Sequence, residues 1–420
     1  MNTRVRNTSQ LWVGVALIAA VLLVPSIGRG DGCYDCHSTW EEGNQAPSKL
    51  IHLDVHYKAG LGCSDCHGGD PNADDMDVVR KSKGFKGVPK PAEIPQFCAS
   101  CHSDPVYMMK HNPSLPTDQL EKYKTSVHGK RLLEKGDTKV ANCVSCHSVH
   151  NIETPLTPTS TVNIQNVPKT CAKCHADSTY MKGYGIPTNQ YNDYVKSVHG
   201  VALLVNKDNG APACNSCHGN HGATPPGVTT LAAVCGTCHA LVADNFDKSP
   251  HKKAFDEAGF PECETCHSNH YVQKPQLYWV GITDSSLCIR CHAANDGTRG
   301  FAVADSVHLA LSRLTDAYDR AAKEIDRADQ KGMMVTDDRF ALNDVKQSII
   351  QGTNEVHLFD ASVVEKTSAE AVKAADKVYE SGQKKIANYY FRRKGLGIAT
   401  LLITILVIAL FFKMRSLDKN

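Results

Sequence analysis

Every cysteine of this 420-residue chain lies in one short pattern, Cys-x-x-Cys-His, which occurs nine times. The nine copies account for all 18 cysteines and for nine of the 20 histidines. Any fold must therefore place two thiols and one imidazole together at nine points. The paired cysteines are Cys33 and Cys36, Cys63 and Cys66, Cys98 and Cys101, Cys143 and Cys146, Cys171 and Cys174, Cys214 and Cys217, Cys235 and Cys238, Cys263 and Cys266, and Cys288 and Cys291. The histidines that follow them are His37, His67, His102, His147, His175, His218, His239, His267 and His292.

This pattern is the attachment signature of c-type haem. Two thiols about one helical turn apart form thioethers to the two vinyl groups of one haem, and the next histidine is held under the iron as its proximal ligand. Zinc half-sites, redox dithiols and disulfide frameworks also use paired cysteines. None of them explains a histidine directly after the second cysteine in all nine copies. The sequence therefore predicts nine covalently bound haem c groups.

The motif region contains an internal repeat. The segment from Cys98 to His150 aligns with the segment from Cys171 to His221, and a shorter third copy runs from Cys235 to His270. Each copy holds two motifs and two further histidines. One of these follows Ser-Val or Ser-Pro, and the other stands three residues after a motif histidine. We expect these histidines to be the sixth ligands of the irons, although the sequence does not say which one serves which haem.

Eleven histidines lie outside the motifs. The three copies supply six candidate distal ligands, the first motifs add His52 and His56, and His308 follows the last motif in a Ser-Val-His context. Asp70 stands where the repeat would place a histidine after His67. The nine candidates are His52, His56, His128, His150, His199, His221, His251, His270 and His308, and His357 and His111 are weaker ones. Two histidines on each iron close the coordination sphere and lower the reduction potential, which favours electron transfer.

The two ends of the chain are apolar. Arg4 and Arg6 precede an apolar run that Pro25 ends, which is typical of a signal peptide over residues 1–30. An uncleaved anchor is the alternative, because no Ala-x-Ala cleavage site is present. Residues 395–412 form a second, uncharged run, whose length as a helix is roughly 27 Å, close to the thickness of the bilayer core. We expect one membrane span here, and a buried core helix is the alternative.

The stretch before this span favours helix. All 19 prolines lie at or before Pro275. Apolar residues recur at three- and four-residue steps from Leu311 to Ile325, Lys331-Gly332 ends this pattern, and Thr336 or Asp337 is a candidate cap for a second helix. A third helix from about Ala361 runs without a breaker into the apolar segment. We expect residues 301–394 to form a helical hairpin or bundle that serves as a stalk.

These parts predict an irregular, mostly α-helical multihaem cytochrome c with little sheet. Its divisions are a signal peptide (1–30), a nonahaem domain of tandem di-haem repeats with a haem-packed core (31–300), the helical stalk (301–394), a transmembrane helix (395–412) and a cytoplasmic tail (413–420). Because bacterial haem attachment takes place outside the cytoplasm, we expect the haem domain in the periplasm, tied to the inner membrane by one C-terminal span. The 46 Lys and Arg nearly balance the 44 Asp and Glu, which argues against a nucleic-acid partner.

The Ser-Val-His-Gly segments, each followed by a Cys-x-x-Cys-His-x-x-His unit, resemble the multihaem c-type cytochromes of anaerobic, metal- and sulfate-respiring bacteria. The stretch Gly210 to Gly227, with the motif at Cys235 and Ser-Pro-His-Lys-Lys after it, carries the same resemblance. Membrane-anchored members look like the cytochrome c subunits of quinol-oxidising cytochrome b/c complexes. The resemblance implies electron transfer from menaquinol, through a membrane cytochrome b or another quinol-oxidising subunit, to periplasmic redox proteins.

The rival interpretation is an enzyme. Multihaem nitrite reductases and hydroxylamine-oxidising enzymes are similar in combining crowded haems with C-terminal helices, and they keep one iron five-coordinate. This chain has no Cys-x-x-Cys-Lys motif. One open iron would nevertheless follow if a candidate such as His52 is not a ligand. A reductase or oxidoreductase of small nitrogen or sulfur compounds is therefore the alternative to an electron-transfer subunit. The apolar C-terminal helix disfavours a third class, the subunit of an extracellular filament.

Overall fold

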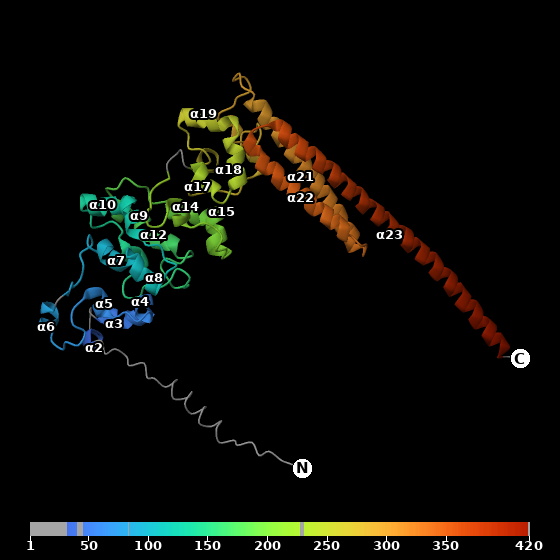
Figure 1. Cartoon of the computed structure of the whole chain (residues 1–420). Coiled ribbons are helices and arrows are strands. Elements are labelled where there is room, and N and C mark those ends of the chain that lie inside the picture. The colour runs from blue at the N-terminus through green and yellow to red at the C-terminus, as the bar shows by residue number, and fades with distance from the viewer. Residues whose placement is uncertain (1–31, 40–44, 83, 227–230, 419–420) are drawn as a thin grey trace, which may run out of the picture. The chain divides into compact units, whose positions relative to one another are not determined.

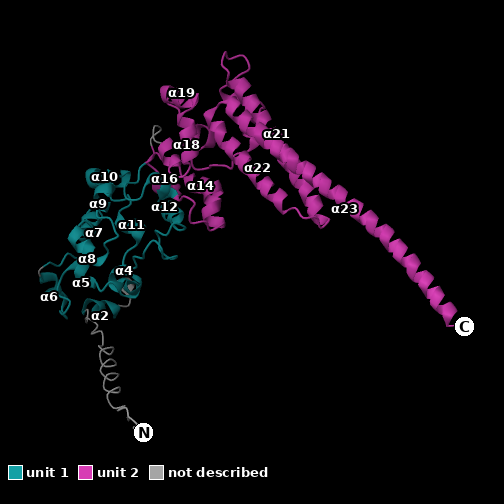
Figure 2. Cartoon of the chain, turned by 45° about the vertical axis from the view of Figure 1, so that its right-hand side comes forward, with its two compact units in different colours: residues 1–174, 214–224 teal, residues 175–213, 225–420 magenta. Residues whose placement is uncertain are grey.

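The computed structural model describes residues 32–39, 45–82, 84–226 and 231–418. It is 65% helical and has no strand within these ranges, which confirms the expected mostly α-helical fold. The chain divides into two compact units, formed by residues 1–174 with 214–224 and by residues 175–213 with 225–420 (Figure 2). The predicted signal peptide, residues 1–30, lies outside the described residues. The predicted domain boundary near residue 300 stays a prediction, although a long helix begins at Gly300.

The first unit is built from short helices (Figure 1). Polar side chains cap the N-termini of several of these helices. Asp104, for example, accepts hydrogen bonds from the backbone N–H groups of Val106 and Tyr107. Its helices are α2 (Gly32–Ser38), α3 (Gln45–Leu50), α4 (Val55–Lys58), α5 (Cys63–His67), α6 (Met76–Lys81), α7 (Ile94–His102), α8 (Pro105–His111), α9 (Gln119–Thr125), α10 (Val127–Lys135), α11 (Cys143–His147), α12 (Val167–His175) and α16 (Cys214–His218), with a 3-10 turn η1 (Ile51–Leu53).

The second unit begins with helices of the same kind. Asp177 starts α13 by accepting from the N–H groups of Thr179 and Tyr180, as Asp104 does in the first unit, so the sequence repeat is also a structural repeat. These elements are α13 (Ser178–Met181), α14 (Gln190–Lys196), α15 (Val198–Gly200), the π turn η2 (Val201–Val205), α17 (Leu231–Gly236), α18 (Ala240–Asp247), α19 (Pro250–Ala258), α20 (Glu264–His267) and the 3-10 turns η4 (Leu277–Trp279) and η5 (Cys288–Arg290).

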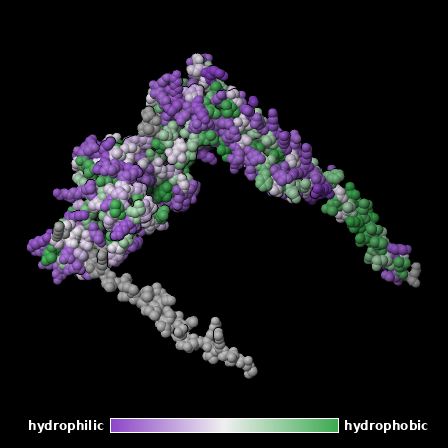
Figure 3. Space-filling model, viewed as in Figure 1, coloured by the Kyte–Doolittle hydropathy of each residue, from purple (hydrophilic) through white to green (hydrophobic). Residues whose placement is uncertain are grey.

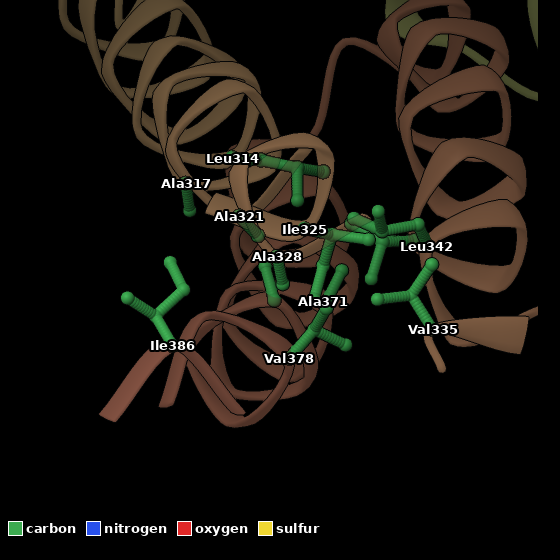
Figure 4. Close-up of a cluster of buried hydrophobic side chains, with 12 residues drawn as sticks. Leu314, Ala317, Ala321, Ile325, Ala328, Val335, Leu342, Ala371, Val378 and Ile386 are labelled. Atoms are coloured by element: carbon green, nitrogen blue, oxygen red, sulfur yellow. The ribbon is translucent and has the colours of Figure 1, made fainter. Parts of the chain in front are cut away.

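Three long helices complete the second unit. They are α21 (Gly300–Gln330), α22 (Thr336–Glu355) and α23 (Ala361–Leu417), with the 3-10 turn η6 (Val356–Leu358) between the last two. They pack side by side as a bundle around an apolar core that includes Leu314, Ile325 and Val345 (Figures 1 and 4). The helices fall where the sequence periodicity predicts them. One detail differs, since α22 begins at Thr336 after an uncapped Val335, so Thr336 and Asp337 lie inside the helix and do not cap it.

Helix α23 has two parts. Up to Ile386 its buried residues face α21 and α22. From Leu396 to Phe412 its large apolar side chains are at least half exposed, and Figure 3 shows them as a continuous hydrophobic stretch. Within the described ranges this is the one helix that is long and apolar enough to cross a membrane. None of that apolar stretch is buried inside the protein, so it is not a core helix of the bundle.

Candidate haem-binding sites

Most of the motifs lie on a single helical turn. Six complete motifs fall on α2, α5, α7, α11, α12 and α16, and a seventh begins at Cys263, directly before α20. In a helix, residues three apart share one face, so the two thiols and the following histidine of such a motif can reach one flat group. The motif at Cys235 runs from α17 to His239, the residue before α18, and only the first three residues of the motif at Cys288 lie in η5. The helical geometry therefore fits the two thioether bonds of haem c.

Each Ser-Val-His-Gly segment starts a helix against the helix before it. The Ser197 hydroxyl accepts a hydrogen bond from the Gly200 N–H at 3.0 Å. A Cβ on Gly200 would lie 1.9 Å from the carbonyl oxygen of Tyr194, so only glycine permits this approach. The Tyr194 hydroxyl donates to the Pro212 carbonyl at 2.8 Å, just before the next motif helix. The backbone at His199 is thereby held against Tyr194, which is tied in turn to Pro212.

The same contacts recur in the earlier copy. Ser126 accepts from the Gly129 N–H at 2.8 Å, and Tyr123 donates to the Ala141 carbonyl at 2.8 Å. Before the first copy, between the motifs at Cys33 and Cys63, Asp54 takes the place of the serine, and its carboxylate accepts from the His56 N–H at 2.8 Å. His56, His128 and His199 therefore occupy equivalent positions.

A further backbone hydrogen bond ties each of these segments to a more distant part of its unit. The N–H of the residue before the histidine donates to a carbonyl two residues after a Cys-x-x-Cys-His-x-x-His unit. Val55 donates to Ile152 at 2.8 Å, Val127 to Ala223 at 3.1 Å and Val198 to Val272 at 2.8 Å. The copies are therefore interlocked, and each Ser-Val-His segment or its Asp54 equivalent packs against a motif that is not its nearest in sequence.

This interlocking brings histidines together in facing pairs. Two metal–nitrogen bonds of about 2 Å, together with the two imidazole half-widths, place ring centres roughly 6 Å apart when both rings ligate one iron. Six pairs of rings, each joining one motif histidine to one candidate distal ligand, have this spacing. They are His56 and His102 (5.8 Å), His67 and His150 (6.1 Å), His147 and His221 (6.0 Å), His199 and His239 (6.2 Å), His251 and His292 (5.8 Å), and His267 and His357 (6.0 Å).

Five of these pairs follow one register. His56, His199 and His251 each face the second motif downstream of themselves. His150 and His221 each face the second motif upstream of their own. In none of these five pairs does the candidate distal histidine face the motif nearest to it in sequence. The interlocking of the copies brings it to a more distant motif.

The ring orientation of several histidines is set at Nδ1. Nδ1 of His67 lies 2.8 Å from the carbonyl oxygen of Gly87. Nδ1 of His218 lies 3.1 Å from that of Thr224, and Nδ1 of His357 lies 3.2 Å from that of Asn354. A ring that donates from Nδ1 presents an unprotonated Nε2, which is the form that binds metal. The carbonyls thus select the tautomer that iron needs.

His56 has the strongest such partner. Its Nδ1 lies 2.9 Å from Oδ1 of Asp54, whose side chain is 3% exposed, and Oδ2 of Asp54 accepts from the Ile152 N–H at 2.8 Å. Burial acts to raise the pKa of Asp54, but the hydrogen bonds from His56 and Ile152 outweigh it and hold the pKa below its ordinary value. Asp54 is therefore an ionised carboxylate behind a candidate iron ligand. Its alignment with Ser126 and Ser197 is the signal that could have singled it out in the sequence.

Burial also keeps many of the paired rings neutral. Desolvation is the main cause that lowers the pKa of eight histidines in these pairs. They are His102, His147, His150, His199, His221, His251, His267 and His357. Since only the neutral imidazole ligates a metal, this environment suits coordination.

The first cysteines of consecutive motifs also meet. The side chain of Cys98 lies beside that of Cys143, that of Cys171 beside Cys214, and that of Cys235 beside Cys263. These pairs belong to the three copies of the sequence repeat. In each copy the attachment points of two haems are in contact.

The other sequence candidates lie in different surroundings. His52 has its Nε2 2.9 Å from the Tyr34 hydroxyl, and His111 stacks on Tyr107 with ring centres 4.4 Å apart. Nε2 of His308 lies 3.4 Å from the Ser312 hydroxyl, and Nδ1 of His270 lies 3.2 Å from Oδ1 of Asn269. His128 lies in the first turn of α10. Ligation by His52, His128, His270 and His308 stays a prediction.

Comparisons with known families match three parts of the chain. The model of cytochrome c3 matches residues 55–176, the doubled CXXCH motif matches residues 254–297, and cytochrome c554 and c-prime match residues 23–68. The chain is a multihaem c-type cytochrome. No curated protein and no solved structure matches it. The cytochrome binds haem c covalently and carries out multihaem electron transfer.

The packing of the cytochrome fits this cofactor. Of the 29 hydrophobic residues that are buried in the described part of the chain, 17 lie between Ala304 and Ile386, and the longer motif region supplies only 12. Side chains alone make a small interior there, as expected where bound haems complete the core. None of the 18 cysteines, all within the described ranges, forms a disulfide. Over the same ranges no three His, Cys, Asp or Glu side chains gather as a zinc site requires.

Proposed function

We propose that this cytochrome is a closed electron relay with nine haem c groups, each held by two histidines. The observation that carries the proposal is the set of facing imidazoles with ring centres 5.8–6.2 Å apart. In the five pairs of one register, the motif histidine is the proximal ligand and its partner is the distal ligand. The remaining haems draw their distal ligands from the other candidates and not from His111, whose ring stacks on Tyr107. Haem c, when bound, supplies a one-electron iron couple.

The order of the sites within each unit supports a relay. In the first unit the Cys98–Cys143 and Cys171–Cys214 contacts join neighbouring motifs, and electrostatic neighbours link Cys66 to Cys101 and Cys146 to Cys171. In the second unit Cys235 contacts Cys263, and Cys266 of the same motif is an electrostatic neighbour of Cys288 in the last motif. These neighbours thus join the attachment sites in sequence order, from Cys63 to Cys217 in the first unit and from Cys235 to Cys291 in the second.

The end of the bundle supports a membrane location. Nζ of Lys331, in the turn between α21 and α22, lies 5.0 Å from the ring centre of Tyr389 and 4.9 Å from that of Tyr390. Arg393 donates to the Tyr389 hydroxyl at 2.6 Å. Tyrosine and basic side chains at the start of an exposed apolar helix are typical of a membrane interface. We therefore propose that residues 395–412 cross the inner membrane. With the haem units in the periplasm, where haem is attached, residues 413–420 would lie in the cytoplasm.

The electron donor we propose is menaquinol, handled by a partner. The segment from Leu396 to Phe412 contains no histidine and no charged residue, so it offers neither a haem ligand nor a proton relay within the membrane. A membrane cytochrome b or another quinol-oxidising subunit would supply both, and periplasmic redox proteins would receive the electrons. Gentle detergent extraction should recover this cytochrome with such a subunit. Recovery of this polypeptide alone would count against the partner.

A test of the closed relay uses carbon monoxide, which binds reduced haem only where a coordination site is open. The dithionite-reduced full-length protein should show no shift of the Soret band on exposure to carbon monoxide. The rival enzyme, a reductase or oxidoreductase of small nitrogen or sulfur compounds, requires one open iron. A carbon monoxide adduct of one haem per chain would favour that alternative and overturn the closed relay.

A further inference from the structure

The sixth histidine pair lies outside the register of the other five. His357 is in η6, the turn between α22 and α23, more than 80 residues beyond the motif histidine His267 that it faces. The two ring centres are 6.0 Å apart and the ring planes are inclined by 21°. His357 belongs to the helical bundle and not to any haem repeat. A count that assigns distal ligands repeat by repeat therefore gives His357 no haem.

The position of His357 is built by the surrounding residues. Its Nδ1 lies 3.2 Å from the carbonyl oxygen of Asn354. The same oxygen accepts a hydrogen bond at 3.1 Å from Nδ2 of Asn245, a side chain of α18 that is 8% exposed. One carbonyl therefore fixes the tautomer of His357 and also fastens η6 to α18, the helix that begins directly after the motif histidine His239.

The residues around η6 also touch a second histidine pair. Phe359, two residues after His357, adopts a left-handed backbone with a φ of 52°. Its ring centre lies 3.8 Å from that of His251, the residue that faces His292. The turn at the start of α23 thus contacts two haem sites of this unit at once.

We propose that His357 is the distal ligand of the haem attached at Cys263 and Cys266, so that the bundle supplies an iron ligand to the haem region. This inference rests on the proposed function and deepens it. It means that α23, the helix that carries the membrane segment, starts four residues after an iron ligand. The haem at Cys263 would then be coordinated directly by the part of the chain that reaches the membrane, which makes this site a candidate entry point for electrons.

The test replaces His357 by alanine in the full-length cytochrome and follows the spin state of the oxidised protein by EPR. We expect the loss of one low-spin haem per chain, the gain of one high-spin signal, and restoration of the low-spin form by added imidazole. The matched control is His111→Ala, which should leave all spin states unchanged because His111 faces Tyr107 and not a motif histidine. An entirely low-spin H357A protein would overturn the proposal.

A second variant covers the case in which H357A does not assemble. His357→Met keeps a ligand but exchanges imidazole for thioether, which should raise the reduction potential of one haem. An unchanged redox titration of H357M would also overturn the assignment. The wild-type protein separates the two hypotheses. High-spin haem in the wild type would count against the closed relay, whereas low-spin spectra in both wild type and H357A would count against His357 alone.

Discussion

The buried carboxylate of Asp54 accepts a hydrogen bond from Nδ1 of His56 at 2.9 Å, while the His56 ring faces that of His102 with centres 5.8 Å apart. A carboxylate behind an imidazole increases the electron donation of the ring to a metal on its far side. In the equivalent copies the residue at this position is a serine, Ser126 or Ser197, which only caps a helix. The site of His56 and His102 should therefore have properties that the related sites lack.

We expect Asp54→Asn to raise the reduction potential of the haem attached at Cys98 and Cys101. The change removes the charge, so the ligand stabilises ferric iron less. A charge-assisted hydrogen bond exceeds a neutral one by about 1 kcal/mol, which is tens of millivolts for a one-electron couple. Spectroelectrochemical titration would measure the shift. Asp74→Asn, an exposed carboxylate nearby in sequence, is the control and should change nothing. Identical titrations of both variants would refute the role of Asp54.

Gly200→Ala should destabilise the Ser-Val-His segment of the second unit. The added Cβ would lie 1.9 Å from the Tyr194 carbonyl oxygen, so α15 must move away from α14 and take His199 with it. We expect a loss of about 2 kcal/mol or more, seen as a lower thermal midpoint and a weaker Soret band. Gly395→Ala serves as control because its Cβ would meet no atom within 4 Å. Equal midpoints for the two variants would contradict the close approach of Gly200 to the Tyr194 carbonyl.

Ile325→Ala should weaken the helical bundle. Its side chain is fully buried between the three helices, and such a truncation costs about 2–5 kcal/mol. Thermal unfolding followed by far-UV circular dichroism would show the loss. Ile350→Ala removes the same atoms from a side chain that is 47% exposed, so its effect should be small. The bundle core would be wrongly placed if the two variants unfolded alike.

A stop codon after Lys394 should release the cytochrome from the membrane, because residues 395–412 carry its exposed apolar segment. We expect the truncated protein in the soluble periplasmic fraction with an unchanged visible spectrum. Fractionation with an alkaline wash would measure this. Retention of the truncated chain in the washed membranes would instead indicate the alternative anchor, an uncleaved N-terminal segment.

The sequence was sufficient for the features that depend on local pattern. The motif helices follow from the spacing of the cysteines, and the three bundle helices follow from apolar periodicity and the absence of proline. The equivalence of Tyr123 and Tyr194 is already visible in the alignment, and the structure gives both tyrosines the same hydrogen bond. Local physics fixes these elements, since each depends on residues within one or two turns.

The pairing of histidines could not be predicted in this way. It depends on contacts such as that between Val55 and Ile152, which join segments almost one hundred residues apart. The repeat count gives nine candidates for nine irons and therefore leaves His357 unassigned, although the structure brings it within 6.0 Å of His267. Asp54 escaped notice for the same reason, because its role requires both His56 and the distant Ile152 N–H.

Low-temperature EPR of the air-oxidised, full-length cytochrome, with and without added nitrite or hydroxylamine, tests the central claim most directly. A closed relay should show only low-spin ferric signals that neither ligand changes. These signals should be of two kinds, because nearly parallel rings such as His147 and His221 (5°) and nearly perpendicular rings such as His251 and His292 (89°) split the iron orbitals differently. A high-spin signal that shifts with nitrite or hydroxylamine would mean an open iron and would contradict the closed relay.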